Sequence, residues 1–187
     1  MFNYTRLFSV IIFLAAMTSS AIAFRNTTYW IDRLNPQPDR SEGGFFKETF
    51  RSNRTVTRKD AYDAKSALTS IYYLLEGKDF SAFHQLLSDE IWYFHAGASL
   101  TIHMIDEAGN LTAAELSDTE TGGLSFAVNA GLWYAAEIPS GTGYTLVSCA
   151  VAPGFEPTEF VLGKKQDPVM LTLFPQHATL WNRLTRE

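Results

Sequence analysis

The residues of this chain best suited to chemistry lie in one segment, His84 to Gly97, which reads HQLLSDEIWYFHAG. His84 precedes Glu90 by six residues, and Trp92 and His95 follow closely. An imidazole and a carboxylate can exchange protons with a ligand or bind a metal ion, and tryptophan offers a stacking face and one N–H donor. The segment therefore predicts a pocket for a small molecule.

Strand alternation decides which of these side chains share the pocket. Successive side chains of a strand point to opposite faces. Glu90, Trp92 and Phe94 therefore share one face, and Tyr93 and His95 share the other. Because tryptophan and phenylalanine favour burial, we expect Glu90 to point inward beside them, where a carboxylate needs a partner or acquires a raised pKa.

Two interpretations of Glu90 stay open. In the first, it forms a structural ion pair with Arg51, and Lys47 and His84 are the other candidate partners. In the second, it contacts a ligand or acts as an acid or base in catalysis.

The first 23 residues have the features of a secretory signal peptide. Arg6 precedes an apolar run of 11 residues, Leu7 to Met17, and Ala21-Ile22-Ala23 forms an A-x-A cleavage site. The run is shorter than the ~20 apolar residues that span a bilayer. We expect cleavage after Ala23, secretion, and a mature chain (residues 24–187) without membrane attachment. An uncleaved anchor is the alternative.

Composition predicts a single domain with a hydrophobic core. The chain is 46% hydrophobic and 14% aromatic, and it contains no internal repeat or low-complexity tract. Its formal net charge of -5 argues against nucleic acid or an anionic membrane as partner. Cys149 is the single cysteine, which rules out an internal disulfide, and its apolar neighbours indicate a buried structural thiol.

Three N-x-T sequons, at Asn26, Asn53 and Asn110, lie in predicted loops or near a terminus. We interpret them as glycosylation sites, which favours a eukaryotic secretory route. A bacterial periplasmic origin is the alternative.

Short apolar or alternating runs separated by turn residues predict an antiparallel β-sandwich or barrel. The expected strands are Phe45–Arg51, Ser66–Leu75, Ser81–Leu86, Glu90–His95, Leu100–Asp106, Ala113–Glu115, Ser125–Val128, Trp133–Ile138, Thr145–Ala152 and Glu159–Leu162. Short helices are expected at both ends. Thr28 to Leu34 forms one, and Asp167 can cap another that begins at Pro168 and runs to Phe174, followed by a last turn or two within 176–184.

Five stretches, in order, resemble motifs of the cupin 5 family, a domain of unknown function numbered 985. They are Ser41–Ser52 (family EGGYFRETYRS), Ser66–Leu75 (STAIYFLL), His84 with Ser88–Phe94 (HxLxSDEIWHF), Ala130–Ala136 (PAGxWQAA) and Val151–Glu156 (VAPGFDF). The resemblance covers nearly the whole mature chain. It implies an all-β, RmlC-like jelly-roll barrel, a double-stranded β-helix, which usually forms a homodimer and has one pocket per barrel.

The chain departs from the metal-binding cupins at two ligand positions. Those proteins carry H-x-H and a glutamate, then P-x-G-x-x-H, a set that suits Fe, Mn, Ni or Zn. Here His84 and Glu90 are kept, but Leu86 and Tyr134 stand where two further histidines are expected, and Asn129 replaces the proline. We therefore expect no metal and no cofactor, with His84 and Glu90 left as candidate ligands. His95 and His103 are the other histidines that can in principle contribute.

Further residues can contact a ligand. Arg51 with Glu48 resembles an Arg/Glu pair of the family, although a spacing of three puts them on opposite strand faces unless a bulge intervenes. Arg51 can hold a carboxylate or phosphate, or serve as a buried structural arginine. Trp92 and Trp133 can form aromatic walls or pack in the core. The candidate ligand-binding residues are Arg51, Tyr72, His84, Glu90, Trp92 and Trp133.

Three functions follow from this set. The first is a secreted, metal-independent cupin that binds a small polar ligand such as a sugar or an amino-acid derivative. The second is an epimerase or isomerase of the RmlC-like type, with His84 as base and Tyr72, Tyr93 or Tyr134 as acid, although a nucleotide-sugar substrate fits poorly with secretion. The third is a structural or storage cupin with a vestigial pocket.

Overall fold

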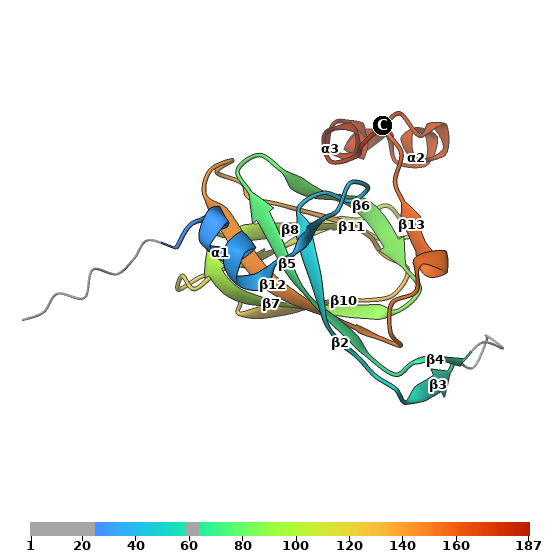
Figure 1. Cartoon of the computed structure of the whole chain (residues 1–187). Coiled ribbons are helices and arrows are strands. Elements are labelled where there is room, and N and C mark those ends of the chain that lie inside the picture. Colours follow the sequence, from blue (N-terminus) through green and yellow to red (C-terminus); the bar gives the residue numbers. More distant parts are fainter. Residues whose placement is uncertain (1–24, 59–63) are drawn as a thin grey trace, which may run out of the picture.

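The fold is known from a computed structural model that describes residues 25–58 and 64–187. Two antiparallel sheets pack face to face (Figure 1). The first has the strand order β1-β2-β5-β12-β7-β10, and the second has the order β13-β6-β11-β8-β9. This arrangement confirms the predicted all-β sandwich. The predicted signal peptide lies outside the described residues.

The strand boundaries follow the sequence pattern closely. The first sheet contains β1 (Gln37–Pro38), β2 (Phe45–Arg51), β5 (Thr69–Glu76), β7 (Asp89–Gly97), β10 (Ser125–Val128) and β12 (Tyr144–Ala152). The second contains β6 (Phe80–Leu86), β8 (Leu100–Ile105), β9 (Leu111–Leu116), β11 (Trp133–Glu137) and β13 (Phe160–Leu162).

A separate hairpin of β3 (Thr55–Thr57) and β4 (Ala64–Ser66) projects from the barrel (Figure 1). The sequence analysis missed β1, β3 and most of β4. Since β1 and β3 are short and fully exposed, they leave no hydrophobic alternation to detect.

Helix α1 (Thr27–Leu34) covers part of the outer face of the first sheet, where Trp30 packs with Leu74 and Leu146. The side chain of Asn26 caps it by accepting a hydrogen bond from the backbone N–H of Tyr29 at 2.9 Å. The predicted N-terminal helix is thereby confirmed.

The C-terminal segment covers the outer face of the second sheet. It contains α2 (Pro168–Leu173), η2 (Pro175–His177) and α3 (Ala178–Arg183), and a further turn, η1 (Pro157–Glu159), precedes β13. The cap predicted at Asp167 is confirmed. None of the helices within 25–58 and 64–187 has the length and apolar character that a membrane span requires.

Trp181 joins this C-terminal segment to the barrel. Its ring stacks on Phe83 of β6 with centroids 4.9 Å apart and meets Trp133 edge-on at 5.2 Å. Its indole N–H donates to the carbonyl of Lys164 at 2.9 Å. Because Trp181 is only 2% exposed, the segment belongs to the hydrophobic core.

We predict that Trp181→Ala lowers the free energy of unfolding by about 3–5 kcal/mol, because it leaves a cavity between α3 and β6. Denaturant unfolding followed by circular dichroism measures this. Leu173→Ala is the matched control, since Leu173 lies on α2 with 60% exposure, and it should change stability by less than ~0.5 kcal/mol. Equal effects of the two changes would contradict the assignment of Trp181 to the core.

Candidate functional site

A cavity of about 290 Å³ lies between the two sheets. Strands β2, β5, β7 and β12 of the first sheet and β6 and β13 of the second contribute to its wall. Its acidic lining residues are Asp39, Glu42, Glu48 and Glu90, and its aromatic lining residues are Phe46, Tyr73, Phe155 and Phe160. The cavity therefore combines carboxylates with aromatic surface.

Glu90 lies on the wall of this cavity and points inward, as strand alternation predicts. It is 7% exposed, and the inward neighbours Trp92 and Phe94 are 1% and 8% exposed, whereas Tyr93 is 40% exposed. The indole N–H of Trp92 and the hydroxyl of Tyr134 both donate to Oε2 of Glu90, at 2.7 and 2.8 Å. Burial raises the pKa of Glu90, although these two donors and the nearby His84 oppose that shift.

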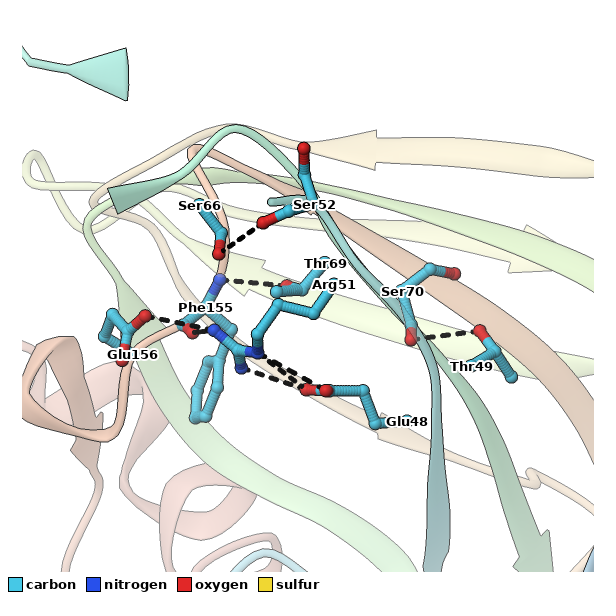
Figure 2. Close-up of polar contacts among 9 residues, drawn as sticks. All are labelled: Glu48, Thr49, Arg51, Ser52, Ser66, Thr69, Ser70, Phe155 and Glu156. Carbon is cyan, nitrogen blue, oxygen red and sulfur yellow. Dashed lines mark hydrogen bonds and ion pairs between the residues drawn. The ribbon is translucent and has the colours of Figure 1, made fainter. Parts of the chain in front are cut away.

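The interpretation of Glu90 as the partner of Arg51 in a structural ion pair is wrong. Arg51 instead donates from Nη2 to Glu48 at 2.9 Å and from Nη1 to Glu156 at 3.0 Å (Figure 2). The strand register of β2 shifts between Glu48 and Phe50, and this bulge allows Glu48 and Arg51 to meet. Lys47, the other basic candidate, is exposed on β2.

Arg51 also fixes the loop that follows β12. Its Nη1 donates to the carbonyl of Phe155 at 3.2 Å, and the backbone N–H of Phe155 donates to Oγ1 of Thr69 at 2.9 Å (Figure 2). Phe155 is thus held from β2 and from β5 at once. Since Arg51, Thr69 and Phe155 all line the cavity, these contacts shape its wall.

His84 faces the same cavity from β6. Its Nδ1 lies 2.7 Å from the carbonyl oxygen of Ala82, which can only accept, so Nδ1 carries the proton and Nε2 is the acceptor of the neutral ring. Burial lowers the pKa of His84, and the charge of Glu90 opposes this. The ring lies against Tyr134, with centroids 4.0 Å apart, and against Phe160 at 5.2 Å.

Glu42 is a cavity residue that the sequence analysis missed. It accepts a hydrogen bond from the hydroxyl of Ser81, and burial of its carboxyl, with a smaller contribution from Asp39, raises its pKa to about 7. Glu42 precedes the Gly43-Gly44 pair. Gly43 has φ 112°, and a Cβ there would lie 2.2 Å from the carbonyl oxygen of Phe80. The glycine thus permits the close approach that places Glu42.

Three predicted ligand-binding residues, Tyr72, Trp92 and Trp133, do not line the cavity, and their assignment to its wall is corrected. Trp92 is buried within the barrel, whereas Tyr72 and Trp133 point outward. Tyr72 points to the outer face of the first sheet, where its ring meets that of His95 edge-on with centroids 5.8 Å apart. Trp133 points to the outer face of the second sheet and packs on Trp181. The prediction for Tyr72 and Trp133 is off by one residue in each strand, because their neighbours Tyr73 and Tyr134 point inward instead.

The remaining candidates occupy supporting positions. Trp92 is buried behind Glu90 and is absent from the cavity wall, and Tyr134 reaches the site through its hydroxyl. His103 lies 2.9 Å from Glu137, outside the cavity. Cys149 is buried, as predicted, and lines the cavity, where burial raises the pKa of its thiol well above the usual range.

The residues at this site do not fit a four-ligand metal centre of the cupin type. Within the described parts of the chain, no three His, Cys, Asp or Glu side chains come together in a way that could hold a metal ion. Leu86 lines the cavity with an apolar side chain. The hydroxyl of Tyr134 donates to Glu90. His84 and Glu90 therefore lack the partners such a site requires.

Comparisons with known proteins agree with this architecture. The family model described as "Cupin superfamily (DUF985)" matches residues 28–163. A protein from Shewanella oneidensis has a similar structure, with 35% identity, a TM-score of 0.76, and coverage of 87% of this chain and 98% of that one. A hypothetical protein from Leishmania major has 28% identity, a TM-score of 0.78, and coverage of 87% and 100%.

Oxalate decarboxylase from Bacillus subtilis is a more distant structural match, with 15% identity and a TM-score of 0.50. The match covers 74% of this chain and 34% of that enzyme, so it supports the fold alone. No curated protein matches the chain significantly.

The raised pKa of Glu42 predicts a pH-dependent stability. Between the usual pKa of 4.5 and about 7, the folded protein keeps a proton that the unfolded chain releases, so this group favours folding below pH 4.5 and loses that contribution as the pH rises through 7. The charged or titratable groups that lie near the Glu42 carboxyl are Asp39, Arg186, Tyr73 and Glu90.

We predict that Glu42→Gln removes this dependence. Relative to the wild type, the variant should gain up to about 3 kcal/mol between pH 4 and pH 8, measured by urea unfolding at each pH. Glu76→Gln, at an exposed position at the end of β5, is the control and should show no such gain. Parallel stability curves for wild type and Glu42→Gln would contradict the raised pKa.

Proposed function

We propose that this chain, which belongs to the DUF985 family of the cupin superfamily and has its jelly-roll fold, binds a small polar ligand without a metal ion. The ligand is a sugar or an amino-acid derivative. The observation that carries the proposal is the position of Glu90. Trp92 and Tyr134 hold its Oε2, so Oε1 is left for another donor on the cavity side.

The cost of keeping such groups inside the barrel supports a binding role. Burial of a carboxylate is unfavourable unless its hydrogen bonds are made. Here Glu42 and Glu90 both border a space that side chains do not fill. Its volume of about 290 Å³ is at the lower end of the range for small-molecule sites, which favours a compact ligand. A vestigial pocket is the weaker alternative, because an apolar filling would stabilise the fold more.

A second candidate function is acid–base catalysis of the epimerase or isomerase type. The close contact between the rings of His84 and Tyr134 favours it, because a neutral imidazole with a free Nε2 can accept a proton. Tyr134 is the tyrosine adjacent to His84, whereas Tyr72 and Tyr93 lie on the outer face of the sheet. Turnover of a bound ligand that His84→Asn abolishes would distinguish this function from binding alone.

We propose that this protein is secreted. The N-terminal pattern supports it, and Asn26, Asn53 and Asn110 are all exposed. A homodimer, expected from the family resemblance, stays a prediction.

Expression in a eukaryotic secretory host should yield medium-borne protein that begins at Phe24 and carries glycans on all three asparagines. N-terminal sequencing and peptide mass spectrometry after enzymatic deglycosylation measure both features. Cell-retained protein that still begins at Met1 would contradict the proposal.

The binding function predicts a selective effect of Glu90→Gln. Glutamine keeps an acceptor for Trp92 and Tyr134 but removes the negative charge, so the variant should stay folded and lose roughly tenfold or more in ligand affinity. Thermal-shift screening of sugars and amino-acid derivatives finds the ligand, and calorimetry measures its affinity. Trp133→Phe, outside the cavity, is the control. If Glu90→Gln did not fold, Glu90 would be required for the structure rather than for ligand binding.

A further inference from the structure

The hydrogen-bond donors that contact Glu42 and Glu90 are already used within the protein. The indole N–H of Trp92 and the hydroxyl of Tyr134 donate to Oε2 of Glu90. The hydroxyl of Ser81 donates to Oε1 of Glu42. Each of these groups has one hydrogen to give, so none is left for a ligand.

Tyr73 follows the same rule, because its hydroxyl donates to the carbonyl of Gly43 at 2.8 Å. On Glu90, His84 and Glu42 the groups left over are acceptors, namely Oε1, Nε2 and Oε2 respectively. Nδ1 of His84 donates its hydrogen to the carbonyl oxygen of Ala82, so Nε2 keeps a free lone pair. A ligand that binds these three side chains must therefore supply the N–H or O–H groups.

The charge of the cavity selects the kind of donor. Four carboxylates line it, from Asp39, Glu42, Glu48 and Glu90, whereas Arg51 is the one basic side chain among the described lining residues. Arg51 is already paired with Glu48 and Glu156. Once Glu42 and Glu90 have lost their protons, this excess of negative charge within a low-dielectric wall attracts cations and repels carboxylates and phosphates.

The aromatic lining suits an organic cation rather than a bare metal ion. Phe46, Phe155 and Phe160 present aromatic surface, which binds both hydrocarbon and ammonium groups. A volume of about 290 Å³ exceeds what a single ion requires. No three metal-ligating side chains of the described residues converge on one point.

From these acceptors, charges and aromatic walls, we propose that the cavity binds a small organic amine as its ammonium ion. The ammonium group donates to the carboxylate of Glu90 or of Glu42, other N–H or O–H groups of the ligand face the remaining acceptors, and its carbon skeleton lies against the phenylalanines. This inference rests on the proposed binding function and narrows its two ligand classes to amino sugars and to amines derived from amino acids. It also makes Arg51 a wall residue with a structural role, which was one of the two roles left open by the sequence, rather than an anion-binding group.

Matched ligands that differ in one group test the charge requirement. Isothermal titration calorimetry at pH 7.5 compares glucosamine with N-acetylglucosamine and glucose, and phenethylamine with phenylacetate, on the purified secreted protein. At least one amine should bind roughly tenfold or more tightly than its neutral or acidic counterpart. Its affinity should rise from pH 5.5 to 7.5, as the cavity carboxyls lose their protons.

Other outcomes separate this inference from the broader function. Equal or tighter binding of a neutral or acidic counterpart overturns the amine proposal and leaves the binding function standing. Binding of manganese or zinc chloride alone overturns it in favour of a metal site. Absence of binding by every compound in the panel and in the wider sugar and amino-acid library counts against both.

Substitutions test the position of the ammonium group. Glu42→Gln and Glu90→Gln should each weaken amine binding roughly tenfold, whereas the control Glu76→Gln removes an equal charge at an exposed position and should leave affinity unchanged. Circular dichroism establishes that the variants are folded, and Glu42→Gln carries the test if Glu90→Gln is not. Wild-type affinity in a folded Glu42→Gln and a folded Glu90→Gln would overturn the proposed ammonium position.

Discussion

The arrangement of this site depends on one carboxylate oxygen, Oε2 of Glu90, which accepts two hydrogen bonds. One donor, Trp92, shares strand β7 with Glu90, and the other, Tyr134, reaches across from β11 of the opposite sheet. The bonds therefore connect the two sheets through the core and fix the orientation of the carboxylate. A buried carboxylate without these donors would be strongly unfavourable. With them, Glu90 keeps its second oxygen on the cavity side at a tolerable cost in stability.

The C-terminal segment supports the same site from outside. Arg186 donates to the backbone carbonyl of Glu42 at 3.0 Å and to Asp79 at 2.6 Å, so the end of the chain holds the loop that carries Glu42. Asp79 in turn accepts from the backbone N–H of Gly44 at 2.8 Å. The family match ends at residue 163, yet these contacts make the last residues part of the cavity's framework.

Strand alternation allowed the sequence to predict the inward direction of Glu90 and Trp92, because one wrong step would have exposed a tryptophan. The same rule does not identify which of two adjacent aromatic residues points inward, and so Tyr72 and Trp133 were assigned to the wrong face. The pairing of Arg51 with Glu48 depends on a bulge, a local feature that hydrophobic periodicity does not reveal. Glu42 lies outside the regular strands, and its placement depends on contacts with residues distant in sequence.

Tyr134 shows how the side chains of this barrel differ from those of a four-ligand cupin metal centre. A histidine at its position would offer a lone pair, whereas the tyrosine hydroxyl offers a proton, which it gives to Glu90. Because tyrosine replaces histidine here, Oε2 of Glu90 accepts a hydrogen bond with a lone pair that could otherwise bind a metal ion. With Leu86 at the other position, His84 has no neighbouring imidazole to share an ion. The lone pairs that stay free are separate acceptors, which suits a ligand with several N–H or O–H donors better than a single metal ion.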